Sequence, residues 1–156
     1  MTDGGSSLPQ VQPLLAVLAA GRRCAETGTA FGEGAAAIAS TAASLVTVER
    51  DPARAEIARE RLSGIANVEL FVGDWRRVLP LHAPFDFLFF DAGHIDETPD
   101  VVDLLAPGGL LVKDDLTPNR PGPDPVRSFL LDHPQLVGVE ILTTPTTAAI
   151  VAAKSA

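Results

Sequence analysis

Two glycines, Gly28 and Gly32, lie four residues apart in a stretch that begins at Glu26 and runs into an alanine-rich segment. Glycine tolerates left-handed backbone angles and has no side chain, so such a loop can turn tightly and approach a ligand closely. A helix that follows the loop offers free N–H groups and the positive end of its dipole to an anion. The same spacing also fits a plain turn from a strand into a helix.

Acidic residues end the next two β-rich segments. Glu49 stands about 20 positions after the glycine loop, where a carboxylate can accept hydrogen bonds from both hydroxyls of a ribose. Asp74 could accept from the exocyclic amine of an adenine, with Trp75 near the base. Each also has a structural interpretation: Glu49 and Asp74 fit helix caps, and Trp75 fits a core residue.

An alternation of strands and helices must position these residues. β-rich runs predict strands at residues 22–27, 45–49, 68–72, 85–90, 110–112, 137–142 and 147–152. Helices are expected at residues 8–20, 32–43, 52–62, 98–105 and 124–132, with Asp51-Pro52 and Asp124-Pro125 as helix starts. This order indicates an α/β fold with a doubly wound, seven-stranded, mostly parallel sheet. The short link before the final strand makes that strand antiparallel.

Five segments in order at the predicted strand ends carry a family resemblance. They read ETGTAFGEGAA, LVTVERDP, VELFVGDW, FDFLFFDAGH and PGGLLVKDDL. The set resembles the class I S-adenosylmethionine-dependent methyltransferases and is most similar to the catechol and caffeoyl-CoA type of O-methyltransferase and its small bacterial relatives. The resemblance runs from about residue 22 to residue 116, and the family's seven strands with an antiparallel last strand agree with the predicted sheet.

The resemblance implies a site for S-adenosylmethionine beyond the carboxyl ends of the strands. It assigns Glu26, Gly28 and Gly32 to the methionine half of the cofactor, Glu49 to the ribose, and Asp74 and Trp75 to the adenine.

The resemblance also implies catalytic and metal-binding residues. Asp91 matches the family's first metal-binding aspartate, and Asp114-Asp115 matches its Asp-Asn pair. These three carboxylates would suit a hard ion such as Mg²⁺, which could orient a substrate hydroxyl and lower its pKa. His94 stands where the family often has a lysine base, so Asp91 and His94 are the expected catalytic residues. Asp91 alone is also common here in methyltransferases without a metal.

The length and composition restrict the domain organisation, the partners and the location that are expected. The 156 residues predict one domain over residues 8–156, with residues 1–7 as a frayed tail. A net charge of −8 argues against a nucleic-acid partner. The longest early apolar run, residues 14–20, is far shorter than the ~20 residues of a membrane span, so no membrane partner is expected. Cys24 is the single cysteine, and a cytoplasmic location is expected.

The leading functional hypothesis is methyl transfer from S-adenosylmethionine to an oxygen of a small-molecule acceptor. Two alternatives remain open: a dinucleotide-dependent oxidoreductase domain, and a non-catalytic module that binds S-adenosylmethionine. Only about 20 residues precede the first predicted strand, too few to roof the pocket, so a homodimer is also expected. Its surface would combine the N-terminal helix with Val137, Val139, Ile141 and Ile150, which could instead complete the monomer's core.

Overall fold

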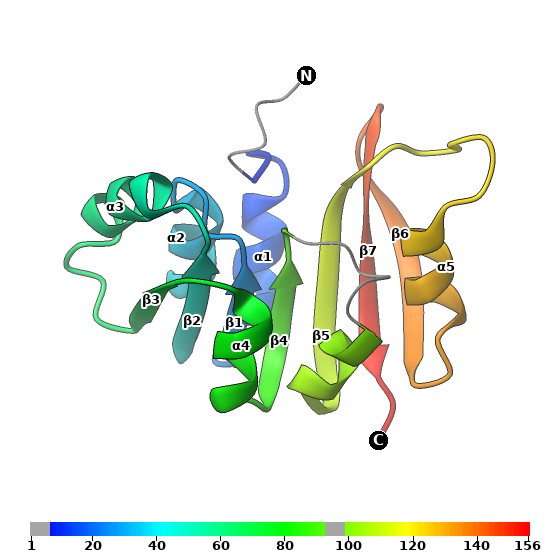
Figure 1. Ribbon diagram of the computed structural model, residues 1–156. Helices are drawn as coiled ribbons and strands as arrows, with labels where there is room; N and C mark the ends of the chain where they lie inside the picture. The colour runs from blue at the N-terminus through cyan, green and yellow to red at the C-terminus, as the bar shows by residue number, and fades with distance from the viewer. Residues whose placement is uncertain (1–6, 93–98) are drawn as a thin grey trace.

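Seven strands form one sheet in the computed structural model, which describes residues 7–92 and 99–156 (Figure 1). The strands are β1 (Arg23–Thr27), β2 (Ser44–Glu49), β3 (Val68–Val72), β4 (Phe85–Phe90), β5 (Leu105–Leu116), β6 (Leu136–Thr144) and β7 (Thr147–Lys154). Their spatial order is β3-β2-β1-β4-β5-β7-β6. The pairs among β1 to β5 are parallel, and β7 is antiparallel to both β5 and β6. The predicted doubly wound sheet is confirmed.

Helices cover both faces of this sheet, as Figure 1 shows. They are α1 (Gln12–Ala19), α2 (Glu33–Ala39), α3 (Pro52–Arg61), α4 (Trp75–Val78) and α5 (Pro125–Asp132), with 3-10 turns η1 (Leu79–Leu81) and η3 (Pro99–Leu104). The two predicted Asp-Pro starts are confirmed. Asp51 accepts a hydrogen bond from Ala53 N at 2.8 Å, and Asp124 accepts one from Arg127 N at 3.1 Å, so each satisfies a free N–H of its helix.

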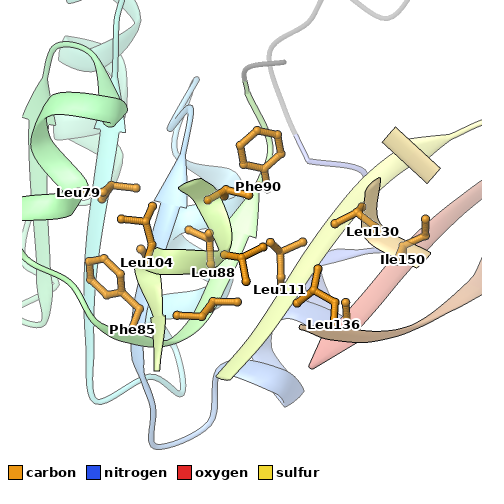
Figure 2. Close-up of a cluster of buried hydrophobic side chains, with 14 of the residues drawn as sticks. Leu79, Phe85, Leu88, Phe90, Leu104, Leu111, Leu130, Leu136 and Ile150 are labelled. Carbon is orange, nitrogen blue, oxygen red and sulfur yellow. The ribbon is translucent and has the colours of Figure 1, made fainter. Parts of the chain in front are cut away.

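The core consists of two apolar clusters, one on each face of the sheet. β4 contributes to both because its side chains alternate: Phe85, Leu88 and Phe90 belong to one cluster, and Phe87 and Phe89 to the other. Figure 2 shows the first cluster, where residues of β4 and β5 meet residues of α5 and β7. Since each fully buried Leu or Phe contributes about 1.5–3 kcal/mol, these layers hold the strand ends in fixed positions.

Two elements differ from their predicted extents. The strand expected at residues 110–112 is the twelve-residue β5, which includes the segment Pro107-Gly108-Gly109. The register between β4 and β5 shifts across this segment, which is how a strand accommodates proline and glycine. The helix expected at residues 98–105 is the 3-10 turn η3.

The closing hairpin forms the edge of the sheet, and β6 is its last strand. Val137 and Val139 of β6 are 76% and 55% exposed, whereas Ile150 of β7 is fully buried in the core. Of the hairpin part of the predicted dimer surface, the two valines therefore remain open to a partner, and Val17 on α1 is exposed as well. None of the helices in the described ranges is long and apolar enough to cross a lipid bilayer.

Candidate cofactor and active site

The loop after β1 touches the end of β4 at the edge to which the β4 arrow points in Figure 1. Ala92 N donates to Thr27 O at 2.9 Å, and Thr27 Oγ1 donates to Ala92 O at 2.9 Å. Gly28 has a φ of +81°, and a Cβ placed on it would overlap the Cβ of Ala92. Gly28 is therefore required for the contact between two strand ends at the point where the strand order reverses, which is where doubly wound sheets bind ligands.

The second predicted glycine, Gly32, lies where the same loop enters α2. Its φ is +88°, and a Cβ there would lie 3.3 Å from Ala58 Cα and from Arg61 Cδ, both on α3. The next residue, Glu33, forms an ion pair with Arg61, with Oε1 and Nη2 3.0 Å apart. This glycine thus allows α2 and α3 to pack closely and shapes the loop between them.

Glu49 lies at the end of β2 and is 7% exposed. Its Oε2 accepts a hydrogen bond from Ala30 N at 2.7 Å, and its Oε1 accepts one from Asp51 N at 2.9 Å. The carboxylate therefore joins the glycine loop to the start of α3. Each carboxylate oxygen can accept more than one hydrogen bond, so capacity for two ribose hydroxyls remains. Ribose binding by Glu49 stays a prediction.

Glu26 is the most deeply buried acid of the site, at 1% exposure. Its Oε2 accepts a hydrogen bond from Thr47 Oγ1 at 2.6 Å, and Thr47 Oγ1 lies 2.6 Å from Thr29 Oγ1. Burial raises the pKa of Glu26 well above its usual value, and the negative charges of Asp91 and its neighbours raise that pKa further. These effects shift Glu26 toward its protonated, neutral form.

Asp91 directly follows β4, and Asp114 lies near the end of β5. The two residues are therefore at neighbouring strand ends. Burial, together with the charge of Asp114, raises the pKa of Asp91 to about 7, although the ammonium of Lys113 opposes the shift. Burial also raises the pKa of Asp114, which is 2% exposed. Within the described ranges, Asp114 Oδ1 has no hydrogen-bond partner. The pair thus offers one carboxyl that exchanges its proton near neutral pH and one buried oxygen that is free to accept a hydrogen bond.

Asp115, the third predicted metal ligand, differs from this pair in its exposure. It is exposed and has a φ of +58°, whereas the preceding Asp114 is buried, and the negative charge of Asp115 contributes to raising the pKa of both Asp91 and Asp114. No group of three or more His, Cys, Asp or Glu residues in residues 7–92 and 99–156 could hold a metal ion. Metal binding by Asp91, Asp114 and Asp115 gains no support from these ranges and stays a prediction. His94, the predicted base, lies outside the described residues.

Asp74 and Trp75, the predicted adenine neighbours, both have structural partners. Asp74 accepts a hydrogen bond from Arg76 N at 2.9 Å as the cap of α4, and its carboxylate pairs with Arg76 Nη2 at 2.7 Å. The hydrogen bond from Arg76 lowers the pKa of Asp74. Trp75 packs edge-on against Phe90, with ring centroids 5.5 Å apart. Contact of either residue with adenine stays a prediction.

Comparison with known proteins decides which doubly wound family this site belongs to. A family model described as a methyltransferase domain matches residues 25–116, from the third residue of β1 to the last residue of β5. The chain belongs to this methyltransferase family. The match covers the glycine loop, Glu49, Asp74, Asp91 and Asp114, so the resemblance to class I S-adenosylmethionine-dependent methyltransferases is confirmed.

Sequence relatives of the methyltransferase include two named protein-L-isoaspartate O-methyltransferase. The one from Methanoculleus marisnigri is 39% identical over 92 residues, which is 58% of this chain and 42% of that protein. The one from Azorhizobium caulinodans is 38% identical over 89 residues, or 56% of this chain and 41% of that protein. The chain thus spans less than half the length of these curated relatives.

Solved structures show that the fold extends beyond this matched segment. The O-methyltransferase from Bacillus cereus in complex with SAH has a TM-score of 0.77 at 21% identity, covering 96% of this chain and 83% of that one. An S-adenosylmethionine-dependent O-methyltransferase from Thermotoga maritima has a TM-score of 0.75 at 20% identity, covering 97% of this chain and 67% of that one. The likeness of fold therefore spans nearly the whole chain, including the residues of the closing hairpin.

Several residues of the methyltransferase site were absent from the sequence prediction. Thr47 carried a usable signal, because it is a polar residue inside an otherwise apolar strand. Ser7 was assigned to a frayed tail, yet it is only 6% exposed, which corrects that assignment. Ala92 carried no such signal, because an alanine in a sequence does not by itself indicate a contact with Gly28.

Replacement of Glu49 with alanine is expected to weaken S-adenosylhomocysteine binding by about 1.5–3 kcal/mol, the range for hydrogen bonds to a charged group. It should also loosen the cofactor site, because Ala30 N and Asp51 N lose their shared acceptor. Titration calorimetry measures the first effect. Glu69→Ala is the matched control, since Glu69 lies exposed on β3. An unchanged dissociation constant in folded Glu49→Ala would refute the ribose assignment.

Proposed function

We propose that this methyltransferase moves a methyl group from S-adenosylmethionine to a hydroxyl oxygen of a small molecule, with Asp91 as the general base. The observation that carries the proposal is the position of Asp91 at the reversal point of the sheet with a pKa of about 7. A base is most effective when its pKa lies near the working pH, because it is then both ionised and able to take a proton.

The charge of the site favours this cofactor. S-adenosylmethionine supplies a positively charged sulfonium, whose methyl group leaves as the C–S bond breaks and its electron pair returns to sulfur. Glu49, Asp91 and Asp114 surround the edge with carboxyl groups, and a cation stabilises their ionised forms. Asp91 takes the proton of the acceptor hydroxyl as its oxygen bonds to the methyl carbon, and the remaining strand-end residues orient the reactants.

The acceptor class follows from the same charges. A neutral hydroxyl gains from a carboxylate that removes its proton, whereas a carboxylate acceptor would be repelled by Asp91 and Asp114. A second candidate is methylation of an isoaspartyl carboxyl group in a protein, and the 39% identity to a protein-L-isoaspartate O-methyltransferase favours it. Such an acceptor would need a cationic partner beyond these two acids.

Two measurements test the proposal. Calorimetry with S-adenosylhomocysteine and with NAD separates a methyltransferase from the oxidoreductase alternative, and only the first ligand is expected to bind. Turnover with a panel of phenols, catechols and an isoaspartyl peptide then separates the two acceptor classes. Methylation of the peptide alone would replace the small-molecule proposal with the second candidate. Binding without turnover on any acceptor would support the non-catalytic module.

Chelation tests whether this reaction uses a metal. Asp91, Asp114 and Asp115 do not form a three-ligand set among the described residues, so no step is assigned to Mg²⁺. EDTA is expected to leave both the melting temperature and the rate of methyl transfer unchanged. If EDTA abolished activity and added Mg²⁺ restored it, this expectation would be wrong. A fall in the melting temperature with EDTA would also contradict it, because an ion bound to the folded state raises its stability.

We also propose that two copies of the chain associate through the hairpin edge. Val137 and Val139 are exposed on β6, whose outer side has no neighbouring strand in the sheet. Light scattering with and without S-adenosylhomocysteine measures the state, and a mass near 16.3 kDa under both conditions would refute the dimer.

A further inference from the structure

Lys113 places a positive charge among the acids at the strand ends. It lies on β5 directly after Val112, which is in register with Phe89 near the end of β4, and Figure 1 shows the two strands side by side. Lys113 Nζ donates a hydrogen bond to the backbone O of Asp91 at 3.4 Å. Its positive charge opposes the rise that burial causes in the pKa of both Asp91 and Asp114. The ammonium is therefore close to both of these carboxyl groups.

The contact with Asp91 uses only part of the hydrogen-bonding capacity of Lys113. An ammonium has three N–H donors. In the part of the chain that the structure describes, Asp91 O is the single acceptor within hydrogen-bonding distance of Nζ, and no acid forms an ion pair with it. The side chain is also half-buried, so bulk water reaches it incompletely. Two donors beside the strand ends are thus available to an oxygen atom of a bound molecule.

Lys154 on the neighbouring strand β7 shows what a structural lysine does in this sheet. Its Nζ donates to Val102 O at 3.0 Å and to Leu105 O at 2.9 Å, so it joins the end of β7 to η3 and to the start of β5. Lys113 makes one longer bond instead and lies next to acids. The two lysines are at opposite ends of β5, because β7 is antiparallel to it, and Lys154 therefore provides a matched control.

We propose that Lys113 binds the reacting oxygen of the methyl acceptor and stabilises the negative charge that develops on it. This inference rests on the proposed function, because it concerns the same acceptor. As Asp91 takes the proton of the hydroxyl, the oxygen gains charge before its bond to the methyl carbon is complete. The product is a neutral ether, so the ammonium interacts more strongly with the transition state than with the product. Interactions that strengthen in the transition state are the ones that raise the rate.

The test removes the charge and follows the rate on a series of phenols of different acidity. Lys113→Met is expected to lower kcat about 10²–10³-fold, the effect of losing one donor to an oxyanion, and to leave the affinity for S-adenosylhomocysteine unchanged in calorimetry. The loss should be greatest for the least acidic phenols, whose oxygen needs the most stabilisation. Lys113→Arg keeps the charge and should retain most of the rate. Lys154→Met should leave kcat unchanged.

A double variant separates a direct effect on the acceptor from an effect through Asp91. If Lys113 binds the acceptor oxygen, Lys113→Met should still lower the single-turnover rate in the Asp91→Asn background. A loss that disappears in this background, or that is equal for all phenols, overturns the assignment and leaves the proposed function intact. Full activity in Lys113→Met does the same. If the wild-type protein methylates no hydroxyl acceptor, the proposed function fails, and this assignment fails with it.

Discussion

Replacing Asp91 with asparagine is expected to lower the rate of methyl transfer by about 10²–10⁴-fold, the usual contribution of a general base. Asparagine has nearly the same shape but cannot accept the proton of the acceptor hydroxyl. The wild-type rate should rise with pH up to about 7, where Asp91 becomes ionised, and the residual rate of the variant should lack this step. A pH profile of kcat/KM measures both effects.

The same replacement is expected to stabilise the unliganded protein at pH 8. The pKa of Asp91 is raised from 3.8 to about 7 on folding, so the protonated form is favoured in the native state. The stability linked to this proton is fully present below about pH 4 and is lost as pH rises through 7. Asparagine stays neutral, so the gain at pH 8 should be on the order of 2–4 kcal/mol, or several degrees in Tm.

Thermal unfolding at pH 5 and pH 8 separates this effect from a general change in packing. Asp103→Asn is the control, because Asp103 is exposed and lies in η3, away from the strand ends. Equal Tm differences at both pH values would show that the charge of Asp91 does not destabilise the protein. Full activity in Asp91→Asn would show that Asp91 is not the base.

Replacing Gly28 with alanine is expected to lower the free energy of unfolding by about 2–5 kcal/mol and to abolish cofactor binding. Two costs add. A residue with a side chain loses about 1–2 kcal/mol at a φ of +81°, and the new Cβ overlaps that of Ala92, which adds about 1–3 kcal/mol of overpacking. The loop after β1 must then separate from the end of β4, where the reactants are expected to meet.

The chain offers a matched control for this strain. Gly21 also has a positive φ, +69°, but a Cβ there would meet nothing within 4 Å. Gly21→Ala should therefore lose only the backbone part, about 1–2 kcal/mol, and keep its affinity for S-adenosylhomocysteine. In the Gly28→Ala background, Ala92→Gly removes the overlapping methyl group and should restore part of the stability. Equal losses in the two single variants would show that the contact with Ala92 is unimportant.

Local patterns in the sequence predict most of the sheet. The apolar run at residues 85–90 and the β-rich run at 68–72 match β4 and β3 at both ends. Prediction was poorest where proline and glycine lie inside a strand, because residues 107–109 carry the signals of a turn. β5 pairs with β4 before and after this segment, at Leu105 and from Leu110, and with β7 from Leu110 onward, a tertiary effect that no local pattern contains.

The site was predictable at strand ends and not beyond them. The motif order placed Glu26, Glu49 and Asp91 at one edge of the sheet, where the structure also has them. The expected metal set stays a prediction, because whether consecutive aspartates face one ion depends on backbone angles, such as the positive φ of Asp115, that no local pattern contains. Ser7 was missed because its burial depends on packing over residues far along the chain.

The carboxylate of Glu49 ties two segments of the site together. Glu49 holds Ala30 N and Asp51 N with its two oxygens, so the glycine loop and the first turn of α3 cannot move apart without breaking a buried, charge-assisted bond. Segments tied in this way open together as one cooperative unit of local unfolding. A ligand that binds the same carboxylate meets a loop that is already ordered, so the entropic cost of ordering this loop falls on folding and not on binding. The affinity of the site is thereby linked to the amide-exchange rate of two segments that are 21 residues apart in sequence.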